Sequence, residues 1–222
     1  PDHPVVAVIG GAKVSDKIAV LTNLASRVDT VLVGGGMVAA FLAAAGYIEA
    51  DPGSYGDIEA ARSLLKDSSA RIVIPTDVIT GMEFSEETEP ITVNVSAISE
   101  DKLILDIGPE SAVAYAKELS GAKTIIWNGP MGVFEWSAFA AGTTAVAQAI
   151  AANDDCVSVV GGGSTGEVVG SLGLRGKITH VSTGGGASLE FLEGKTLPGV
   201  AALLDAVQAP EDSQGDSQDE SD

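Results

Sequence analysis

The stretch Val157-Ser-Val-Val-Gly-Gly-Gly-Ser-Thr165 decides how this chain folds. Its apolar part is short enough for a β-strand, and three glycines separate it from a segment with a helical pattern. A second stretch of this kind occupies residues 178–186, where Ile-Thr-His-Val-Ser-Thr is followed by three more glycines. A strand, a glycine turn and a helix, repeated in succession, predict a fold built from βα units.

Three earlier apolar runs also end in glycine turns, at Gly10-Gly11, Gly34-Gly35-Gly36 and Asn128-Gly129-Pro130. Glycine at a strand-to-helix junction leaves backbone N–H groups accessible, and the helix start adds about half a positive charge. Phosphate oxygens commonly occupy such places. A single glycine turn is more often only a tight connection, but five turns after five apolar runs favour one rim that approaches a ligand.

The remaining sequence alternates short apolar runs with amphipathic segments. Strands are expected at residues 4–9, 30–33, 71–75, 103–106, 124–127, 157–160 and 178–181, with helices between them. This alternation predicts an open, mainly parallel, doubly wound α/β sheet with helices on both faces. Such a three-layer, Rossmann-like fold binds ligands at the carboxyl ends of its strands. Residues 78–95 contain β-branched residues, a charged turn and Pro90, and predict an antiparallel hairpin.

The chain is expected to consist of one domain, residues 1–208, and a tail, residues 209–222. From Pro210 onward the sequence is Glu-Asp-Ser-Gln-Gly-Asp-Ser-Gln-Asp-Glu-Ser-Asp, with no apolar side chain. Such a segment cannot bury apolar surface, so we expect an acidic, disordered tail.

The composition argues against several classes of protein. A net charge of −19 disfavours nucleic acid as a partner, which requires a basic face. No apolar run approaches the ~18 residues needed to span a bilayer, so no membrane association is expected. The single cysteine, Cys156, cannot pair within the chain, which favours the cytoplasm and a buried structural thiol rather than a reactive one.

Two common phosphate-binding motifs are incomplete in this sequence. Gly161-Gly-Gly-Ser-Thr-Gly166 has the spacing of a dinucleotide-binding turn, which requires an acidic residue about 20 positions later. This chain has Val181-Ser182-Thr183 there. A P-loop would need a glycine at position 189, five residues before Gly194-Lys-Thr196, and that position is Leu.

Two lysines follow the first glycine turn. The pattern predicts a helix capped by Ser15, with Asp16 in its first turn. Lys13 and Lys17 are four residues apart and are therefore expected on one side of that helix. They are either two solvated surface lysines or cations that neutralise phosphate, and phosphoryl transfer depends mainly on positioning and charge neutralisation.

Longer motifs point to a family. Val8-Ile-Gly-Gly-Ala-Lys-Val-Ser-Asp-Lys17, Gly34-Gly-Gly-Met37, Leu105-Asp-Ile-Gly-Pro109, Trp127-Asn-Gly-Pro-Met-Gly-Val-Phe-Glu-Trp136 and His180-Val-Ser-Thr-Gly-Gly-Gly-Ala-Ser-Leu-Glu-Phe-Leu-Glu-Gly-Lys195 resemble phosphoglycerate kinase. The resemblance follows the family's order from residue 4 to about residue 206. It covers only the family's carboxyl-terminal, nucleotide-binding half.

The resemblance implies roles for individual residues. Gly11, Ala12, Gly34, Gly35, Gly36 and Leu105 would line the adenine slot; Asn128, Pro130 and Val133 would border the nucleotide, and Glu135 would bind the ribose hydroxyls. Lys13 would neutralise the transferring phosphoryl group, and Lys17 the nucleotide phosphates. The nucleotide would also be bound by Gly162, Gly163, Ser164 and Thr165, and the transferring phosphate by Thr183, Gly184 and Gly185. Donors where charge develops would come from Gly162, Gly163, Thr165, Gly184, Gly185 and Gly186, with Gly163 and Gly186 catalytic beside Lys13.

This chain departs from the family pattern at two positions. Ser164 stands where the family has an aspartate that helps to hold the magnesium–nucleotide complex, and serine is a weaker ligand for a hard cation. Ile104 replaces a glycine and is expected to narrow the adenine slot. The family's amino-terminal half, which grips phosphoglycerate, is not represented in this sequence.

The function implied by the resemblance is phosphoryl transfer between 1,3-bisphosphoglycerate and ADP, giving 3-phosphoglycerate and ATP, with Mg²⁺ accompanying the nucleotide. 3-Phosphoglycerate would be a partner only with the amino-terminal half present, and a monomer is expected. Two alternatives remain: a non-catalytic module that binds adenine nucleotides, and an interaction protein that uses the acidic tail for contact.

Overall fold

The computed structural model describes residues 1–49 and 52–208, and the predicted acidic tail lies outside the described residues. Six parallel strands form the central sheet in the order β3-β2-β1-β7-β8-β9. They are β1 (Val5–Ile9), β2 (Thr30–Val33), β3 (Arg71–Val73), β7 (Thr124–Asn128), β8 (Val157–Gly161) and β9 (His180–Val181). The prediction of an open, parallel, doubly wound sheet is confirmed.

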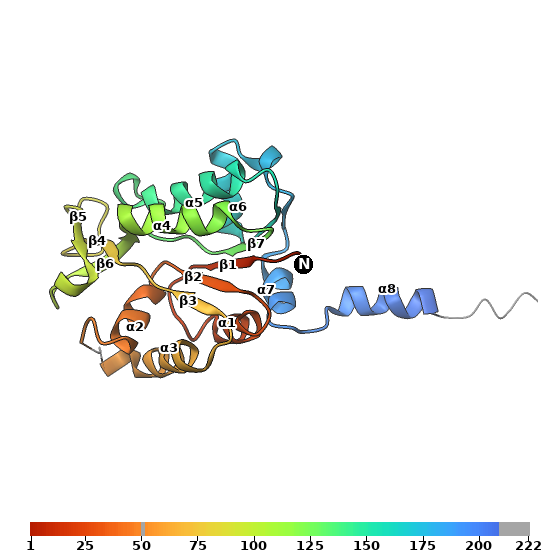
Figure 1. Ribbon diagram of the computed structural model, residues 1–222, viewed down its shortest axis with the longest axis horizontal. Helices are drawn as coiled ribbons and strands as arrows, with labels where there is room; N and C mark the ends of the chain where they lie inside the picture. The colour runs from red at the N-terminus through yellow and green to blue at the C-terminus, as the bar shows by residue number, and fades with distance from the viewer. Residues whose placement is uncertain (50–51, 209–222) are drawn as a thin grey trace, which may run out of the picture.

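Helices cover both faces of this sheet (Figure 1). One face carries α1 (Ile18–Ala25), α2 (Met37–Ala44) and α3 (Tyr55–Asp67), with α7 (Gly185–Leu192) against α1. The other face carries α4 (Pro109–Ser120), α5 (Ala141–Ala152) and α6 (Gly163–Ser171). The last helix, α8 (Pro198–Gln208), extends away from the sheet in Figure 1.

Strand β1 shows why its apolar run is continuous. Val5, Ala7 and Ile9 belong to the core beneath α1 and α2, whereas Val6 and Val8 belong to the core beneath α4 and α5. All five side chains are buried. A parallel strand with helices on both faces has no polar side, so its sequence does not alternate.

A second, antiparallel sheet has the order β5-β4-β6, with β4 (Asp77–Gly81), β5 (Ile91–Asn94) and β6 (Leu103–Ile107). The expected hairpin is formed by β4 and β5. Strand β6 does not enter the central sheet but pairs with β4. Its run Leu-Ile-Leu-Asp-Ile has the composition of a core strand, so its sequence alone does not reveal which sheet it joins.

The prediction for the segment after β1 is wrong in detail. Helix α1 begins at Ile18, its N-cap is Lys17, and its first turn holds no acidic residue. Ser15 is not a cap: its backbone N–H donates to Asp57 Oδ1 at 2.8 Å. Lys13 and Lys17 therefore do not share a helix side, because residues 13–17 form a turn held to α3 by that contact.

Candidate nucleotide-binding site

The strand order reverses between β1 and β7. The sheet extends from β1 to β3 in one direction and from β7 to β9 in the other. In open α/β sheets, ligands bind beyond the carboxyl ends of the strands where the order reverses in this way. Here those ends carry Gly10 and Gly11 after β1, and Gly129 and Pro130 after β7.

The first three glycine turns pack against one another. Gly10 N donates to Asn128 O at 3.0 Å, Gly35 N to Met131 O at 2.8 Å, and Met37 N to Gly11 O at 3.1 Å. Gly35 has φ +68°, and a Cβ there would lie 2.6 Å from the backbone nitrogen of Gly11. Only glycine allows this approach without strain or overlap.

Lys17 lies beside the end of β7 and has neutral hydrogen-bond partners. Its Nζ donates to the backbone oxygen of Asn128 at 3.2 Å and also contacts Asn128 Oδ1. Burial lowers the pKa of Lys17 to about 8, and the charge of Asp16 opposes that effect. In the described part of the chain, Lys17 forms no ion pair with a carboxylate. A half-buried ammonium without a counter-ion favours an anionic ligand.

Asn128 connects Lys17 to the fourth glycine turn. Its side chain is buried, and Nδ2 has no hydrogen-bond partner. A Cβ on Gly161 would lie 3.2 Å from that Nδ2, and one on Gly162 would lie 3.5 Å from it. A buried donor without a partner is costly and is commonly satisfied by water or a ligand. Asn128 therefore presents an N–H group toward the turn after β8.

The helices at this edge begin without side-chain caps. Gly36, Gly162 and Gly184 are the N-caps of α2, α6 and α7, and none of these helices has a side-chain hydrogen bond at its cap. The first N–H groups of a helix lack partners within the helix. At α2 the first two N–H groups donate to Gly11 O and Gly35 O, whereas the uncapped starts of α6 and α7 suit phosphate oxygens.

The fourth and fifth turns lie beside each other. A Cβ on Gly185 would be 4.0 Å from the backbone nitrogen of Gly163. Gly162 has φ +97°, and buried Thr165 fixes the turn by contacting the carbonyl oxygens of Gly161 and Gly162. Gly163, Ser164, Thr183, Gly184 and Gly186 are exposed there.

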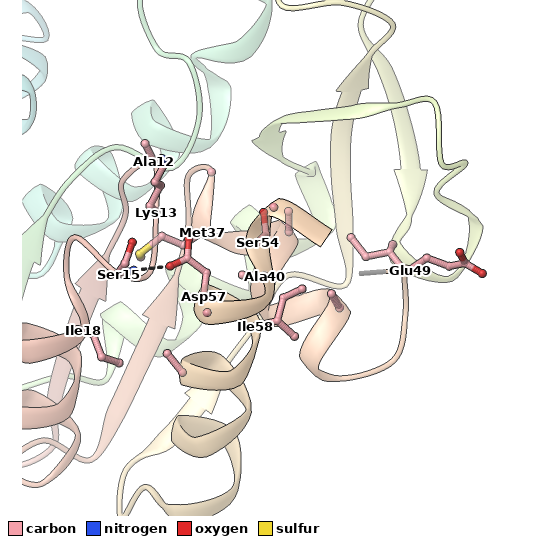
Figure 2. A pocket seen from close by; sticks show the side chains of 17 residues that line it. Ala12, Lys13, Ser15, Ile18, Met37, Ala40, Glu49, Ser54, Asp57 and Ile58 are labelled. Carbon is pink, nitrogen blue, oxygen red and sulfur yellow. Dashed lines mark hydrogen bonds between the residues drawn. The ribbon is translucent and has the colours of Figure 1, made fainter. Parts of the chain in front are cut away.

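A cavity of about 820 Å³ adjoins the first two turns (Figure 2). Ala12 and Lys13 line it together with Met37 of α2 and Asp57 of α3. A second cavity of about 540 Å³ includes Ile104. The two share Ala39, Ile48, Glu49 and Ser54 as lining residues. Ile104 thus lies on the neighbouring cavity rather than among the residues lining the larger one.

The other predicted residues lie around the loop at 129–136. Val133 N donates to Leu105 O at 2.8 Å, so β6 holds this loop. Leu105 is buried and packs over Gly81 of the antiparallel sheet. Glu135 is exposed. The ligand roles assigned to these residues stay predictions.

The described residues do not provide a cluster of carboxylates that could bind a metal ion. Among residues 1–49 and 52–208, no group of three or more His, Cys, Asp or Glu side chains could hold a metal ion. Mg²⁺ binds through one or two carboxylates together with water and substrate phosphates. The exposed hydroxyl of Ser164 is a poor replacement for such a carboxylate.

Sequence reasoning missed three residues that shape the site: Asp57, Asp106 and Thr143. Asp57 holds the turn before α1, and Thr143 Oγ1 accepts from Met131 N at 3.0 Å. Asp106 accepts from Gly142 N at 2.8 Å. The motif at Leu105–Pro109 contained an available signal, because an acidic residue inside an apolar strand requires a specific partner.

Comparisons with known proteins show the family. The family model for phosphoglycerate kinase matches residues 1–195. A phosphoglycerate kinase from Moorella thermoacetica is 49% identical over 214 residues, which cover 92% of this chain and 53% of that protein. One from Clostridium novyi is 47% identical over 214 residues, covering 92% of this chain and 52% of that protein.

Solved structures give the same result. Phosphoglycerate kinase from Coxiella burnetii has a TM-score of 0.87 and 41% identity, over 94% of this chain and 54% of that one. The enzyme from Pyrococcus horikoshii OT3 has a TM-score of 0.81 and 34% identity, over 93% and 53%. This chain spans about half the length of the relatives it matches. Among the described residues, no helix is long and apolar enough to cross a membrane.

Proposed function

The chain belongs to the phosphoglycerate kinase family, and we propose that residues 1–208 form the nucleotide-binding half of such a kinase. The proposed reaction transfers a phosphoryl group between 1,3-bisphosphoglycerate and ADP, giving 3-phosphoglycerate and ATP. This half would hold ADP or ATP, and an amino-terminal half would hold the phosphoglycerate.

The observation that carries this proposal is the pair Lys17 and Asn128 at the reversal of strand order. A half-buried ammonium without a carboxylate partner lies beside a buried amide donor without a partner. Each group costs free energy when it is buried without a charged or hydrogen-bonding partner, and a polyphosphate would satisfy both.

We assign the other groups to the transfer itself. Lys13, exposed at the mouth of the cavity, would neutralise the moving phosphoryl group, while Gly163 and Gly186 would offer backbone donors where charge develops. Donors already oriented by the fold need no reorganisation during the reaction. Catalysis would also require the second substrate in line and the exclusion of water, which a two-domain kinase achieves by closure.

The proposal includes Mg²⁺ with the nucleotide, although the residues present fit it only weakly. Ser164 would be the protein ligand, and the nucleotide phosphates and water would supply the remaining oxygens. We further propose a monomeric, cytoplasmic protein; the lone, half-buried Cys156 is consistent with a reducing compartment.

Calorimetric titration with ADP tests the proposal. Lys17→Ala should weaken binding about ten- to hundred-fold, the range for losing a hydrogen bond to a charged group. The exposed Lys66 at the end of α3 is the matched control, and Lys66→Ala should bind like the unaltered chain. Equal affinity in Lys17→Ala and Lys66→Ala would refute the assignment of the phosphates to Lys17 and Asn128.

A second candidate function is a non-catalytic module that binds adenine nucleotides. The serine at position 164, in place of the family's aspartate, favours it because binding to glycine turns does not require that carboxylate. In this case ADP would bind, but no phosphoryl transfer would follow even with an amino-terminal half supplied.

A further inference from the structure

Asp106 is a carboxylic acid buried within strand β6, opposite Ile79 of β4. Its exposed fraction is 1%. Burial raises the pKa of Asp106 to about 7, while hydrogen bonds from two backbone N–H groups act in the opposite direction. Burying a carboxylate costs free energy unless hydrogen bonds compensate for the lost water, so the contacts of Asp106 require an explanation.

The carboxylate of Asp106 serves the first turn of helix α5. Gly142 N donates to Oδ2 at 2.8 Å, and Ile107 N donates to Oδ1 at 2.9 Å. Helix α5 has Ala140 as its N-cap, without a side-chain cap, and its first turn holds no acidic residue. Asp106 therefore supplies from another element the acceptor and the negative charge that a helix start requires.

The carboxylate also fits between α5 and the loop at residues 131–136. A Cβ on Gly132 or on Gly142 would lie 2.4 Å from Asp106 Oδ1. Two further contacts fasten the loop at the same place: Val133 N donates to Leu105 O at 2.8 Å, and Met131 N donates to Thr143 Oγ1 at 3.0 Å. The loop is thus hydrogen-bonded both to β6 and to the first turn of α5.

We propose that Asp106 is a positioning residue, which fixes the 131–136 loop in the conformation that presents Val133 and Glu135 to the nucleotide. It acts by accepting a hydrogen bond from Gly142 N at the start of α5, where Thr143 binds Met131 N of the loop, and by filling the space that Gly132 and Gly142 leave open. This inference rests on the proposed nucleotide-binding function for its ligand, whereas the ordering of the loop is a property of the protein alone.

The test is Asp106→Asn, compared with the unaltered chain at about pH 8. The amide has the shape of the carboxylate, but it offers one acceptor oxygen and turns an N–H group toward one of the two backbone donors. Amide hydrogen exchange should become at least about ten-fold faster at Val133, Phe134 and Trp136. Exchange in β1 and β7 should not change.

Asp77→Asn is the matched control. Asp77 is also buried, belongs to the same antiparallel sheet, and caps α4 through Glu110 N at 3.0 Å and Ser111 N at 2.7 Å. Its variant should loosen α4 but leave both the loop and the affinity for ADP unchanged, whereas Asp106→Asn should weaken ADP binding about ten-fold. Equal loop exchange in the two variants, or unchanged ADP affinity in Asp106→Asn, would overturn the proposal.

A second variant covers the case in which Asp106→Asn fails to fold. Gly142→Ala retains the carboxylate but forces a methyl group against it, and should accelerate exchange in the same loop amides. Unchanged exchange there would overturn the inference. If the unaltered chain does not bind ADP, the proposed function fails, and the exchange comparison still decides whether Asp106 orders the loop.

Discussion

The affinity for ADP should fall above pH 8 because of Lys17. Its ammonium is half-buried, and burial lowers its pKa from 10.5 to about 8. A bound diphosphate favours the charged form and should restore the pKa toward its ordinary value. Free protein must then take up a proton to bind ADP at high pH, so binding and protonation are linked.

The magnitude follows from these two pKa values. With a free-state pKa of about 8, the charged fraction of Lys17 falls from about three quarters at pH 7.5 to about one tenth at pH 9. With a bound-state pKa near 10.5, the complex remains charged throughout. The dissociation constant should therefore rise about eight-fold between these pH values. The terminal phosphate, with a second pKa of about 6, is already ionised across this range.

The assay is calorimetric titration with ADP at both pH values, in buffers of different ionisation enthalpy so that proton uptake is measured directly. Lys17→Arg is the informative variant because arginine remains charged, and its affinity should not change with pH. Lys66→Arg alters an exposed lysine and should keep the eight-fold loss. If the unaltered chain has the same dissociation constant at both pH values and takes up no proton on binding, the role given to Lys17 is refuted.

Three further predictions concern stability and metal binding. Gly35→Ala should lower the free energy of unfolding by at least about 2 kcal/mol, because the added Cβ would overlap the backbone of Gly11. Gly46→Ala, at φ +83° with no atom within 4 Å, should lower it by only about 1 kcal/mol. Equal losses in urea unfolding would show that the contact between Gly35 and Gly11 is unimportant. Tyr115→Phe removes a buried hydroxyl that donates to Val33 O at 2.6 Å and should cost about 1–2 kcal/mol by the same assay, against almost nothing for the exposed Tyr47→Phe. Ser164→Asp should tighten Mg-ADP binding about ten-fold and leave metal-free ADP unaffected; no change in calorimetry would indicate that another group already holds the metal.

The strands could be predicted closely because their sequences are dominated by one physical requirement. Residues 5–9 are apolar throughout because helices cover both faces of the sheet, and residues 157–160 are apolar except for Ser158; the structure has strands in both places. The first three glycine turns are equally visible in the sequence, because the close approach of their backbones leaves no room for a side chain.

The start of α1 could not be predicted, because a contact distant in sequence decides it. Ser15 and Asp16 have the pattern of a helix start, but Ser15 N is bound by Asp57, 42 residues later. Local capping signals compete with such tertiary contacts and lose when the contact is well placed. The strand that pairs with β6 could not be predicted for the same reason. The apolar sequence of β6 fits either sheet, and only its pairing with β4 shows that it belongs to the antiparallel one.

The lysines illustrate the same limit at the site. Their spacing suggested a shared helix side, whereas the structure separates an exposed Lys13 from a half-buried Lys17. The pairing of Lys17 with Asn128 joins residues 111 positions apart, and no local pattern encodes it.

A crystal structure of this chain with Mg-ADP tests the central claim most directly. If Lys17 and Asn128 bind the phosphates, the diphosphate will lie within hydrogen-bond distance of Lys17 Nζ and Asn128 Nδ2, with its terminal phosphate toward the turn at Gly162 and Gly163. The claim is contradicted by ordered ADP whose phosphates lie elsewhere, for example over the apolar groove formed by Val159, Phe191 and Leu197.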